Sequence, residues 1–445
     1  MRNLLNFLSD SKNTLKLLIG ITFVSVLFRV GAALFLGNQI SEMPGVSDQI
    51  SYHTLGIRLA GGYGFTFDRP WWPATQAGEP TAHWSYLYSY FVAGIYWLFG
   101  PHPLLVRLLQ ALIIGIIHPL LIFVVGKLSF NSRVGLIAAA ITSVYIYFVY
   151  YSATLMTEPF YIAGILAILG TSGWIVKNAN QILENPRKYL LFAFLLGVAT
   201  SLTILLRQAF LLFLPFLYTW LLFVLRKNYL VPALKMIGIN VLIITLFILP
   251  FTIYNYERFN QFVLLNTNAG FAFYWANHPI YGTHFEGILS QSTYLDLLPK
   301  ELYGLNEAAL DRELLNRGLQ FVIQDPLRYF FLSLSRIPVY FMFWPSPHSS
   351  ILSNISRIGS FGVFLPFMIY GLMTTLAKKG EEKVTLYSPV FLLLLFILVY
   401  SLIHIFTWTL IRYRLPVDAV LVLFAAVGFS DLIQKIQQRK AVTLS

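Results

Sequence analysis

The stretch LLVRLLQALIIGIIHPLLIFVV, residues 104–125, decides the fold class of this chain. It carries one charged residue, Arg107, among otherwise mostly aliphatic side chains. A helix needs about 20 apolar residues to cross the hydrocarbon core of a bilayer. This stretch is therefore long enough and apolar enough to be a transmembrane helix.

The same pattern recurs along the whole chain. Of the 445 residues, 57% are hydrophobic and only 11% are charged, which is too little charge to cover a soluble core. Two further apolar stretches, 84–99 and 328–345, are short, aromatic and flanked by prolines, so we expect them to lie in the membrane interface. We predict an all-α polytopic membrane protein whose spans are 17–36, 104–125, 134–151, 159–176, 189–206, 209–225, 236–253, 358–376, 386–405 and 415–432.

The charge distribution predicts which side of the membrane each loop faces. With the N-terminus inside, the cytoplasmic segments hold 17 of the 31 basic residues but only five of the 19 acidic ones. The whole net charge of +12 then lies on one side, as the positive-inside rule requires. Eight basic residues would be misplaced if 84–99 and 328–345 also crossed. We therefore predict a multi-pass protein of the plasma (inner) membrane with both termini cytoplasmic, and no nucleic-acid partner.

This topology leaves two long segments outside, 37–103 and 254–357. It predicts a transmembrane module over 1–253 that includes the first outer segment, an extracytoplasmic region over 254–357, and C-terminal transmembrane helices over 358–445. Within the second outer segment, residues 300–324 have the apolar spacing of one or two amphipathic helices. The cytoplasmic loops are all short, so we expect any chemistry to face outward.

Charged side chains gather at the predicted outer ends of the spans, where polar groups are costly and need a reason. Acids that face several arginines are typical of a site for a phosphate-bearing substrate. Each residue also has a structural reading, because acids cap helices and long cations reach from a membrane toward water. Arg29, inside the first span, is expected to pair with an acid or to reach outward. The outer group comprises Asp48, Arg107, Glu158, Arg207, Arg412, Arg414 and Asp418.

Other side chains on the outer side carry weaker signals. His83 and His278 lack the spacing of a metal site. Trp71 and Trp72 are either interfacial belt residues or a platform on which a sugar stacks. The chain contains neither a phosphate-binding glycine loop with its lysine nor a nucleophilic serine elbow.

Taken in order, several short motifs resemble the GT-C glycosyltransferases, most of all the branch of protein O-mannosyltransferases and aminoarabinose transferases. The resemblance covers most of the chain. It rests on Asp48 with Tyr52, Leu98-Phe99-Gly100 before Arg107, Thr157-Glu158-Pro159, Leu205-Leu206-Arg207, Asn266-Thr267-Asn268-Ala269-Gly270, Asn277-His278-Pro279, Asp325-Pro326, and Arg412-Tyr413-Arg414-Leu415-Pro416.

The resemblance implies transfer of a sugar, with inversion, from a polyprenyl-phosphate donor to a hydroxyl of a glycan, lipid or protein acceptor. Asp48 takes the position of the family's catalytic carboxylate, and Glu158 takes the position of its second acidic residue. The substrate-binding residues implied are Arg107, Arg207, Arg412, Arg414, Tyr52, His83, Asn277 and His278. A divalent cation is the candidate cofactor. Two departures concern the substrate, since Gln49 stands where many members have Glu, and His83-Trp84 stands where a proline is expected.

Two other classes of function remain open from the residues. A transporter or flippase of lipid-linked sugars would use the same cations without a base, but it often shows internal repeats, and we find none. A polysaccharide polymerase or ligase would also have a large outer segment, with a lipid diphosphate as donor.

Overall fold

The computed structural model describes residues 11–43, 48–285, 287, 289–347, 349–380 and 383–443. Arg2, Asp10, Glu381 and Glu382, which enter the predicted charge balance, lie outside the described residues. Over the described part the chain is helical, and its β-structure is limited to two isolated bridges, Thr66 with Pro80 and Trp71 with Thr75. The prediction of an all-α protein is confirmed.

Nine of the described helices are long and apolar enough to cross a membrane, and a bent pair of helices makes a tenth candidate. Each of the ten overlaps one predicted span. They are α2 (Ser11–Leu36), α5 (Pro103–Ser129), the pair α6 (Ser132–Val144) and α7 (Ile146–Ser152), α8 (Glu158–Lys177), α10 (Pro186–Leu206), η1 (Gln208–Phe213) with α11 (Leu214–Leu225), α12 (Leu230–Phe259), α17 (Ile351–Arg357) with η4 (Ile358–Gly362) and α18 (Val363–Leu376), α19 (Pro389–Phe406), and η6 (Ile411–Arg414) with α20 (Leu415–Thr443).

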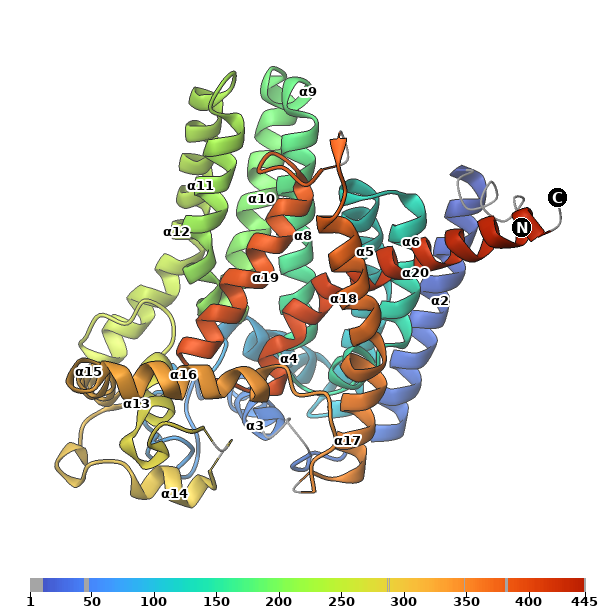
Figure 1. Ribbon diagram of the computed structural model, residues 1–445. Helices are drawn as coiled ribbons and strands as arrows, with labels where there is room; N and C mark the ends of the chain where they lie inside the picture. Colours follow the sequence, from blue (N-terminus) through green and yellow to red (C-terminus); the bar gives the residue numbers. More distant parts are fainter. Residues whose placement is uncertain are drawn as a thin grey trace.

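The shorter helices lie at the ends of this bundle. In Figure 1, α3, α13, α14, α15 and α16 gather at one end, while α9 and the turn between α11 and α12 lie at the other. Both predicted outer segments thus lie at the same end. The shorter elements are α3 (Asp48–Ala60), α4 (Tyr86–Phe99), α9 (Ala179–Leu183), α13 (Ala269–Asn277), η2 (Pro279–Tyr281), α14 (Gln291–Asp296), η3 (Lys300–Leu302), α15 (Glu307–Gln324) and α16 (Pro326–Tyr340).

The helices α4 and α16 cover the two aromatic stretches that were expected in the interface. They have 14 and 15 residues. At 1.5 Å per residue each is about 21–23 Å long, shorter than the roughly 30 Å of a hydrocarbon core. The amphipathic helix expected within 300–324 is also present, as α15.

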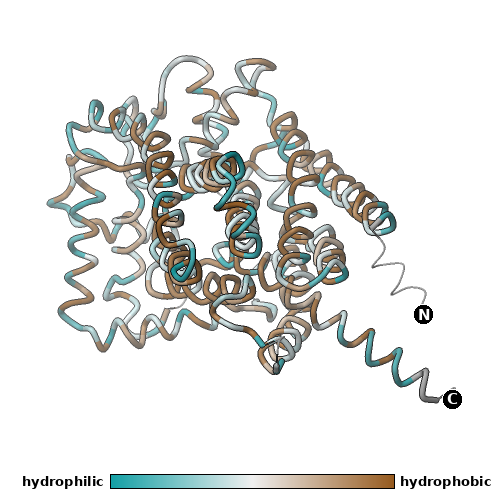
Figure 2. Tube along the Cα trace, turned by 90° about the horizontal axis from the view of Figure 1, so that it is seen from above, coloured by the Kyte–Doolittle hydropathy of each residue, from teal (hydrophilic) through white to brown (hydrophobic). Residues whose placement is uncertain are grey.

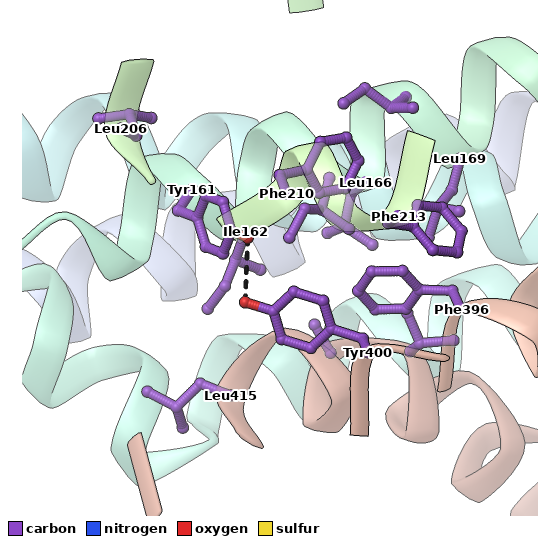
Figure 3. Packing of buried hydrophobic residues seen from close by; sticks show 14 of the residues in the cluster. Tyr161, Ile162, Leu166, Leu169, Leu206, Phe210, Phe213, Phe396, Tyr400 and Leu415 are labelled. Atoms are coloured by element: carbon purple, nitrogen blue, oxygen red, sulfur yellow. Dashed lines mark hydrogen bonds between the residues drawn. The ribbon is translucent and has the colours of Figure 1, made fainter. Parts of the chain in front are cut away.

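Hydrophobic residues predominate along the helices of the bundle, which are coloured mostly brown in Figure 2. Aromatic residues fill the space between α8, η1 and α19 (Figure 3), where Phe210, Phe213 and Phe396 pack together. The hydroxyl of Tyr400 donates to the hydroxyl of Tyr161 at 3.0 Å. This contact ties α19 to α8, the two helices whose ends meet at the candidate site.

Arg29 has neither of the two fates expected from the sequence. It is fully buried, and its guanidinium donates to the carbonyl oxygen of Thr142 at 3.1 Å and to the hydroxyl of Ser25 at 2.6 Å. The bend of 59° between α6 and α7 leaves carbonyls at the end of α6 without helical partners. Arg29 therefore stabilises a break in a span, a role that needs neither an acid nor water.

Candidate functional site

A cavity of about 1230 Å³ lies at the end of the bundle that carries the outer segments. Its wall is built from α3, the first outer segment, η1, α13, α14, the end of α19 and η6. Ligand sites are commonly concave and mostly apolar with a few converging polar groups. Five residues predicted from the sequence line it: Asp48, Tyr52, His83, Arg207 and Arg412.

Two acids and two arginines meet at the cavity, where Asp48, Arg207 and Arg412 line the wall and the buried Glu158 contacts the two arginines without lining it. A side-chain nitrogen of Arg412 lies 2.8 Å from the carboxylate of Asp48, and its Nε lies 3.8 Å from that of Glu158. Arg207 contacts Glu158 at 2.5 Å and donates through Nε to the hydroxyl of Thr157 at 3.0 Å. Glu158 is 1% exposed, while the Asp48 side chain is 22% exposed. Asp48 is therefore the acid that solvent and ligands reach.

Helix ends bring these four groups together. Asp48 opens α3, and Glu158, followed by Pro159, opens α8. Acids are favoured in the first turn of a helix by the orphan amides and the helix dipole. Arg207 lies in the break between α10 and η1, and Arg412 lies in η6 before α20. The position of each acid at the start of a helix is thus compatible with a role in the site.

The aromatic ring of Tyr413 supports both arginines. The guanidinium carbons of Arg207 and Arg412 lie 5.0 and 5.3 Å from its centroid, within the range of cation–π contacts. Burial alone would lower the pKa of the Arg207 guanidinium, but the carboxylate of Glu158 raises it above its ordinary value. Arg207 therefore stays charged in the cavity wall.

Tyr52 and His83 lie beside this cluster. Burial, together with the negative charge of Asp48, raises the pKa of the Tyr52 phenol, which keeps it a hydrogen-bond donor. His83 Nδ1 lies 3.0 Å from the carbonyl oxygen of Thr267, and burial lowers the pKa of this imidazole. Because a carbonyl only accepts, Nδ1 of the neutral ring carries the proton and Nε2 is left as an acceptor.

Arg107 and Arg414 lie apart from the lining of the cavity. Arg107 is buried and donates to the carbonyl oxygens of Leu36 at 3.1 Å and Gln39 at 2.8 Å, and to Gln49 Oε1 at 3.2 Å. It thereby fastens the chain after α2 and the start of α3.

Arg414 forms a fully buried ion pair with Asp418 at 2.8 Å. It also donates to the carbonyl oxygen of Tyr340 at 2.8 Å, and its guanidinium carbon lies 3.5 Å from the ring centroid of Phe361. These contacts join η6 to α16 and η4, so Arg414 has a structural role in the described conformation.

Asn277 and His278 also lie apart from the cavity lining. Asn277 is buried and its Oδ1 accepts from Arg336 at 3.0 Å, which links α13 to α16. His278 Nδ1 accepts from the backbone N–H of Ile280 at 3.2 Å and so caps η2. The structure groups these two residues with the outer helices and not with the acids.

Several cavity residues carried no usable signal in the sequence. Trp84, Trp275, Trp408 and His404 line the wall and come from three segments that are distant in the sequence, since His404 and Trp408 are close neighbours. Trp71 and Trp72, for which a sugar platform was the alternative to a membrane belt, also line it. Trp72 stacks on Trp275 at 4.9 Å, which joins the first outer segment to α13.

Glu307 locks the two outer segments together beneath the cavity. It is 5% exposed and its carboxylate accepts from the hydroxyl of Thr75 at 2.6 Å and from the backbone N–H of Ala82 at 2.8 Å. It also accepts from the hydroxyl of Thr267. The spacing of its helix was visible in the sequence, but two of its three partners, Thr75 and Ala82, lie more than 200 residues away in the first outer segment.

Comparison with known proteins identifies the fold. No protein-family model and no curated protein sequence matches this chain. The archaeal oligosaccharyltransferase AglB from Archaeoglobus fulgidus, in complex with an inhibitory peptide and a dolichol-phosphate, is similar with a TM-score of 0.57 and 15% identity. The match covers 96% of this chain and 51% of AglB. The apo form gives a TM-score of 0.60 and 16% identity over 97% of this chain and 52% of AglB.

Two other solved structures are also similar to this chain. AglB in complex with Zn and sulfate matches with a TM-score of 0.57 and 14% identity over 96% of this chain and 50% of that one. ArnT from Cupriavidus metallidurans, bound to undecaprenyl phosphate, matches at 0.43 and 10% identity over 95% of this chain and 61% of ArnT. The chain spans about half the length of AglB. The predicted GT-C fold is confirmed, and at these identities the likeness concerns the fold alone.

The described residues do not fit a divalent-cation site. They contain no group of three His, Asp or Glu side chains close enough to hold a metal ion. Hard cations need several oxygen ligands, whereas Asp48 and Glu158 each already contact an arginine. We therefore derive no chemical step through a metal.

Proposed function

We propose that this chain is a membrane glycosyltransferase that moves a sugar from a polyprenyl-phosphate donor to an acceptor hydroxyl. The observation that carries the proposal is the cavity lined by Asp48, Arg207 and Arg412, whose two arginines also contact the buried Glu158. The fold supports it, because AglB, which has this fold, is named an oligosaccharyltransferase and binds a dolichol-phosphate. The acceptor is a glycan, a lipid or a protein.

In this proposal the two arginines hold the phosphate of the donor. Guanidinium groups suit phosphate because they offer a planar fork of donors. As the bond between the sugar carbon and the phosphate oxygen breaks, the lipid phosphate gains a second negative charge. Cations fixed in advance stabilise that charge as it develops. Arg207 and Arg412 are the arginines that line the cavity close to the acids, while Arg107 and Arg414 stabilise the scaffold.

Asp48 acts as the general base. The acceptor oxygen attacks the anomeric carbon on the face opposite the phosphate, and its proton passes to the Asp48 carboxylate, so the anomeric configuration inverts. Arg412 contacts Asp48 at 2.8 Å in the described conformation. A phosphate that binds Arg412 draws it away from Asp48 and leaves the carboxylate able to accept a proton. Glu158 positions Arg207 and Arg412 and does not touch the substrate.

The same proposal includes the orientation in the membrane. The end that carries the cavity faces away from the cytoplasm of the plasma membrane, and α9 and both termini face the cytoplasm. The basis is the charge excess in the short loops. The division into 1–253, 254–357 and 358–445 remains a proposal, in which the middle region covers the cavity and selects the acceptor.

The test is Asp48→Asn in nanodiscs, assayed for sugar transfer from undecaprenyl-phosphate sugars to a membrane lipid extract. We expect at least a 100-fold loss of rate, since a general base contributes about 10²–10⁴. Asp296→Asn is the matched control, because Asp296 is exposed at the end of α14 and lies outside the cavity lining. Retained activity in Asp48→Asn contradicts the proposed base. Lipid translocation without transfer by the wild-type chain favours a flippase.

A further inference from the structure

Two buried polar atoms on residues that line the cavity have no hydrogen-bond partner among the described residues. They are Nε2 of His404 and Nε1 of Trp84. The two residues are only 6% and 7% exposed. Leaving a buried polar group without a hydrogen bond is energetically costly, so such atoms on residues that line a cavity are candidate contacts for a ligand.

The polarity of His404 follows from its other nitrogen. Nδ1 lies 3.3 Å from the carbonyl oxygen of Trp408. A carbonyl accepts only, so the proton of the neutral ring is on Nδ1 and Nε2 presents a lone pair. The ring is held by three tyrosines, with centroids 4.9 Å from Tyr400, 4.9 Å from Tyr413 and 6.2 Å from Tyr340. His404 is therefore a fixed acceptor.

Trp84 supplies the opposite polarity. The indole N–H is a donor only, and its ring packs against Tyr52 with a centroid distance of 5.6 Å. The residues of the wall thus include an unpartnered acceptor on α19 and an unpartnered donor before α4. A hydroxyl group both donates and accepts, so it satisfies either atom, whereas a phosphate oxygen without a proton cannot satisfy an acceptor.

We propose that His404 and Trp84 bind hydroxyl groups of the substrate, with His404 Nε2 accepting from a hydroxyl and Trp84 donating to an oxygen. This inference rests on the proposed function and deepens it, because it names the chemical group of the substrate that this part of the wall would bind. His404 shares the Tyr413 ring with Arg207 and Arg412. The recognised hydroxyl therefore lies next to the proposed phosphate site. It belongs to the transferred sugar or to the acceptor.

The first experiment does not require turnover. Diethyl pyrocarbonate modifies unprotonated imidazole nitrogens, and peptide mass spectrometry reports each histidine of the full chain in nanodiscs. We expect His404 to react at least tenfold faster than His118, because His118 Nε2 is also buried and unpartnered but lies outside the cavity lining. Equal, slow modification of both histidines overturns the proposal, since Nε2 of His404 would not face the cavity.

Protection of His404 from modification by bound lipids identifies the group that His404 binds. The probes are undecaprenyl phosphate and undecaprenyl phosphate carrying mannose, glucose, galactose or aminoarabinose. Stronger protection by a sugar-bearing lipid than by undecaprenyl phosphate supports a hydroxyl of the donor. This comparison works even if no transfer is found, so its outcome is separate from that of the proposed function.

The third experiment measures the transfer kinetics of two His404 variants. His404→Phe keeps a ring beside the tyrosines and removes the acceptor, while His404→Gln restores an acceptor. We expect His404→Phe to raise KM about three- to tenfold, the value of one neutral hydrogen bond, for the donor or for the acceptor according to which carries the hydroxyl. His404→Gln recovers part of the loss. Unchanged KM for both substrates, together with equal protection by all lipids, overturns the proposal.

Discussion

The ion pair between Arg207 and Glu158 provides the sharpest test of the site's construction. Glu158 is 1% exposed and its carboxylate lies 2.5 Å from Arg207, while Arg412 is further away at 3.8 Å. In Arg207→Gln the buried carboxylate loses its nearer cation. Removing one partner of a buried ion pair costs about 3–5 kcal/mol. Because Arg207 is 17% exposed and Arg412 remains, we expect the lower end, about 3 kcal/mol.

The double variant separates the pair from its surroundings. Glu158→Gln alone leaves two neighbouring cations with one acid, Asp48, and we expect it to cost about 2 kcal/mol. In the double variant no charge is left unpaired, because Arg412 keeps its contact with Asp48. We expect the double variant to lose about 3 kcal/mol and not the additive 5, which corresponds to a coupling of about 2 kcal/mol, within the usual range for contacting residues.

Unfolding in mixtures with sodium dodecyl sulfate measures these free energies. The chain has no cysteine, so one cysteine introduced at the fully buried Ala419 reports the opening of the core to a thiol-reactive dye. The exposed pair of Arg317 and Glu301, at 2.9 Å, is the matched control. Its double-mutant coupling should be much smaller than that of Arg207 with Glu158, because water screens exposed charges. Additive losses at Arg207 and Glu158 would refute the account of the site as a paired cluster.

Three further predictions concern topology, scaffold and pH. A cysteine at Asn180, in α9, should resist an impermeant thiol reagent added outside, while one at Ser292 on α14 should react; the reverse pattern would invert the proposed orientation. Arg107→Lys should lower the thermal unfolding midpoint by several degrees and leave KM for the lipid donor within twofold, because the lysine loses two or three hydrogen bonds worth about 1 kcal/mol each; a higher donor KM with unchanged stability would restore Arg107 to the phosphate site. Burial raises the pKa of Asp311 to about 7 from its ordinary 3.8, although it accepts from the backbone N–H of Gly270. Folding therefore takes up a proton between these values, so stability should fall as the pH rises from about 4 to 7, and Asp311→Asn should flatten that pH dependence of the unfolding midpoint.

The spans and the acids of the site could be predicted because their signals are local. A run of about 20 apolar residues marks a helix wherever its neighbours lie, and Asp48 and Glu158 stand where helices begin. Arg207 and Arg412 were also visible, since cations on the predicted outer side oppose the predicted charge bias. The only further condition for predicting the site was that these helix ends meet at one end of the bundle.

The other arginines could not be assigned from the sequence, because a sequence shows a cation but not its partner. Arg29 and Arg107 are satisfied chiefly by backbone carbonyls, and carbonyl positions depend on how the helices bend and end. Arg414 is different, since Asp418 follows it by four residues and a buried i, i+4 pair is a local signal. His404 and Trp84 can be recognised as candidate binding residues only when the structure shows that distant segments enclose one cavity.

The neutrality of the site has a consequence for the order of events in the proposed reaction. Two carboxylates and two guanidinium groups cancel, so the empty cavity holds its arginines in place without a net charge. In the proposed reaction a donor phosphate competes with Asp48 for Arg412. Under this proposal the carboxylate becomes a competent base when the donor has drawn Arg412 away, and it is held by Arg412 when the donor is absent. The proposed ion-pair exchange would couple donor binding to activation of the acceptor, because the proposed base and the proposed phosphate-binding cation are in direct contact.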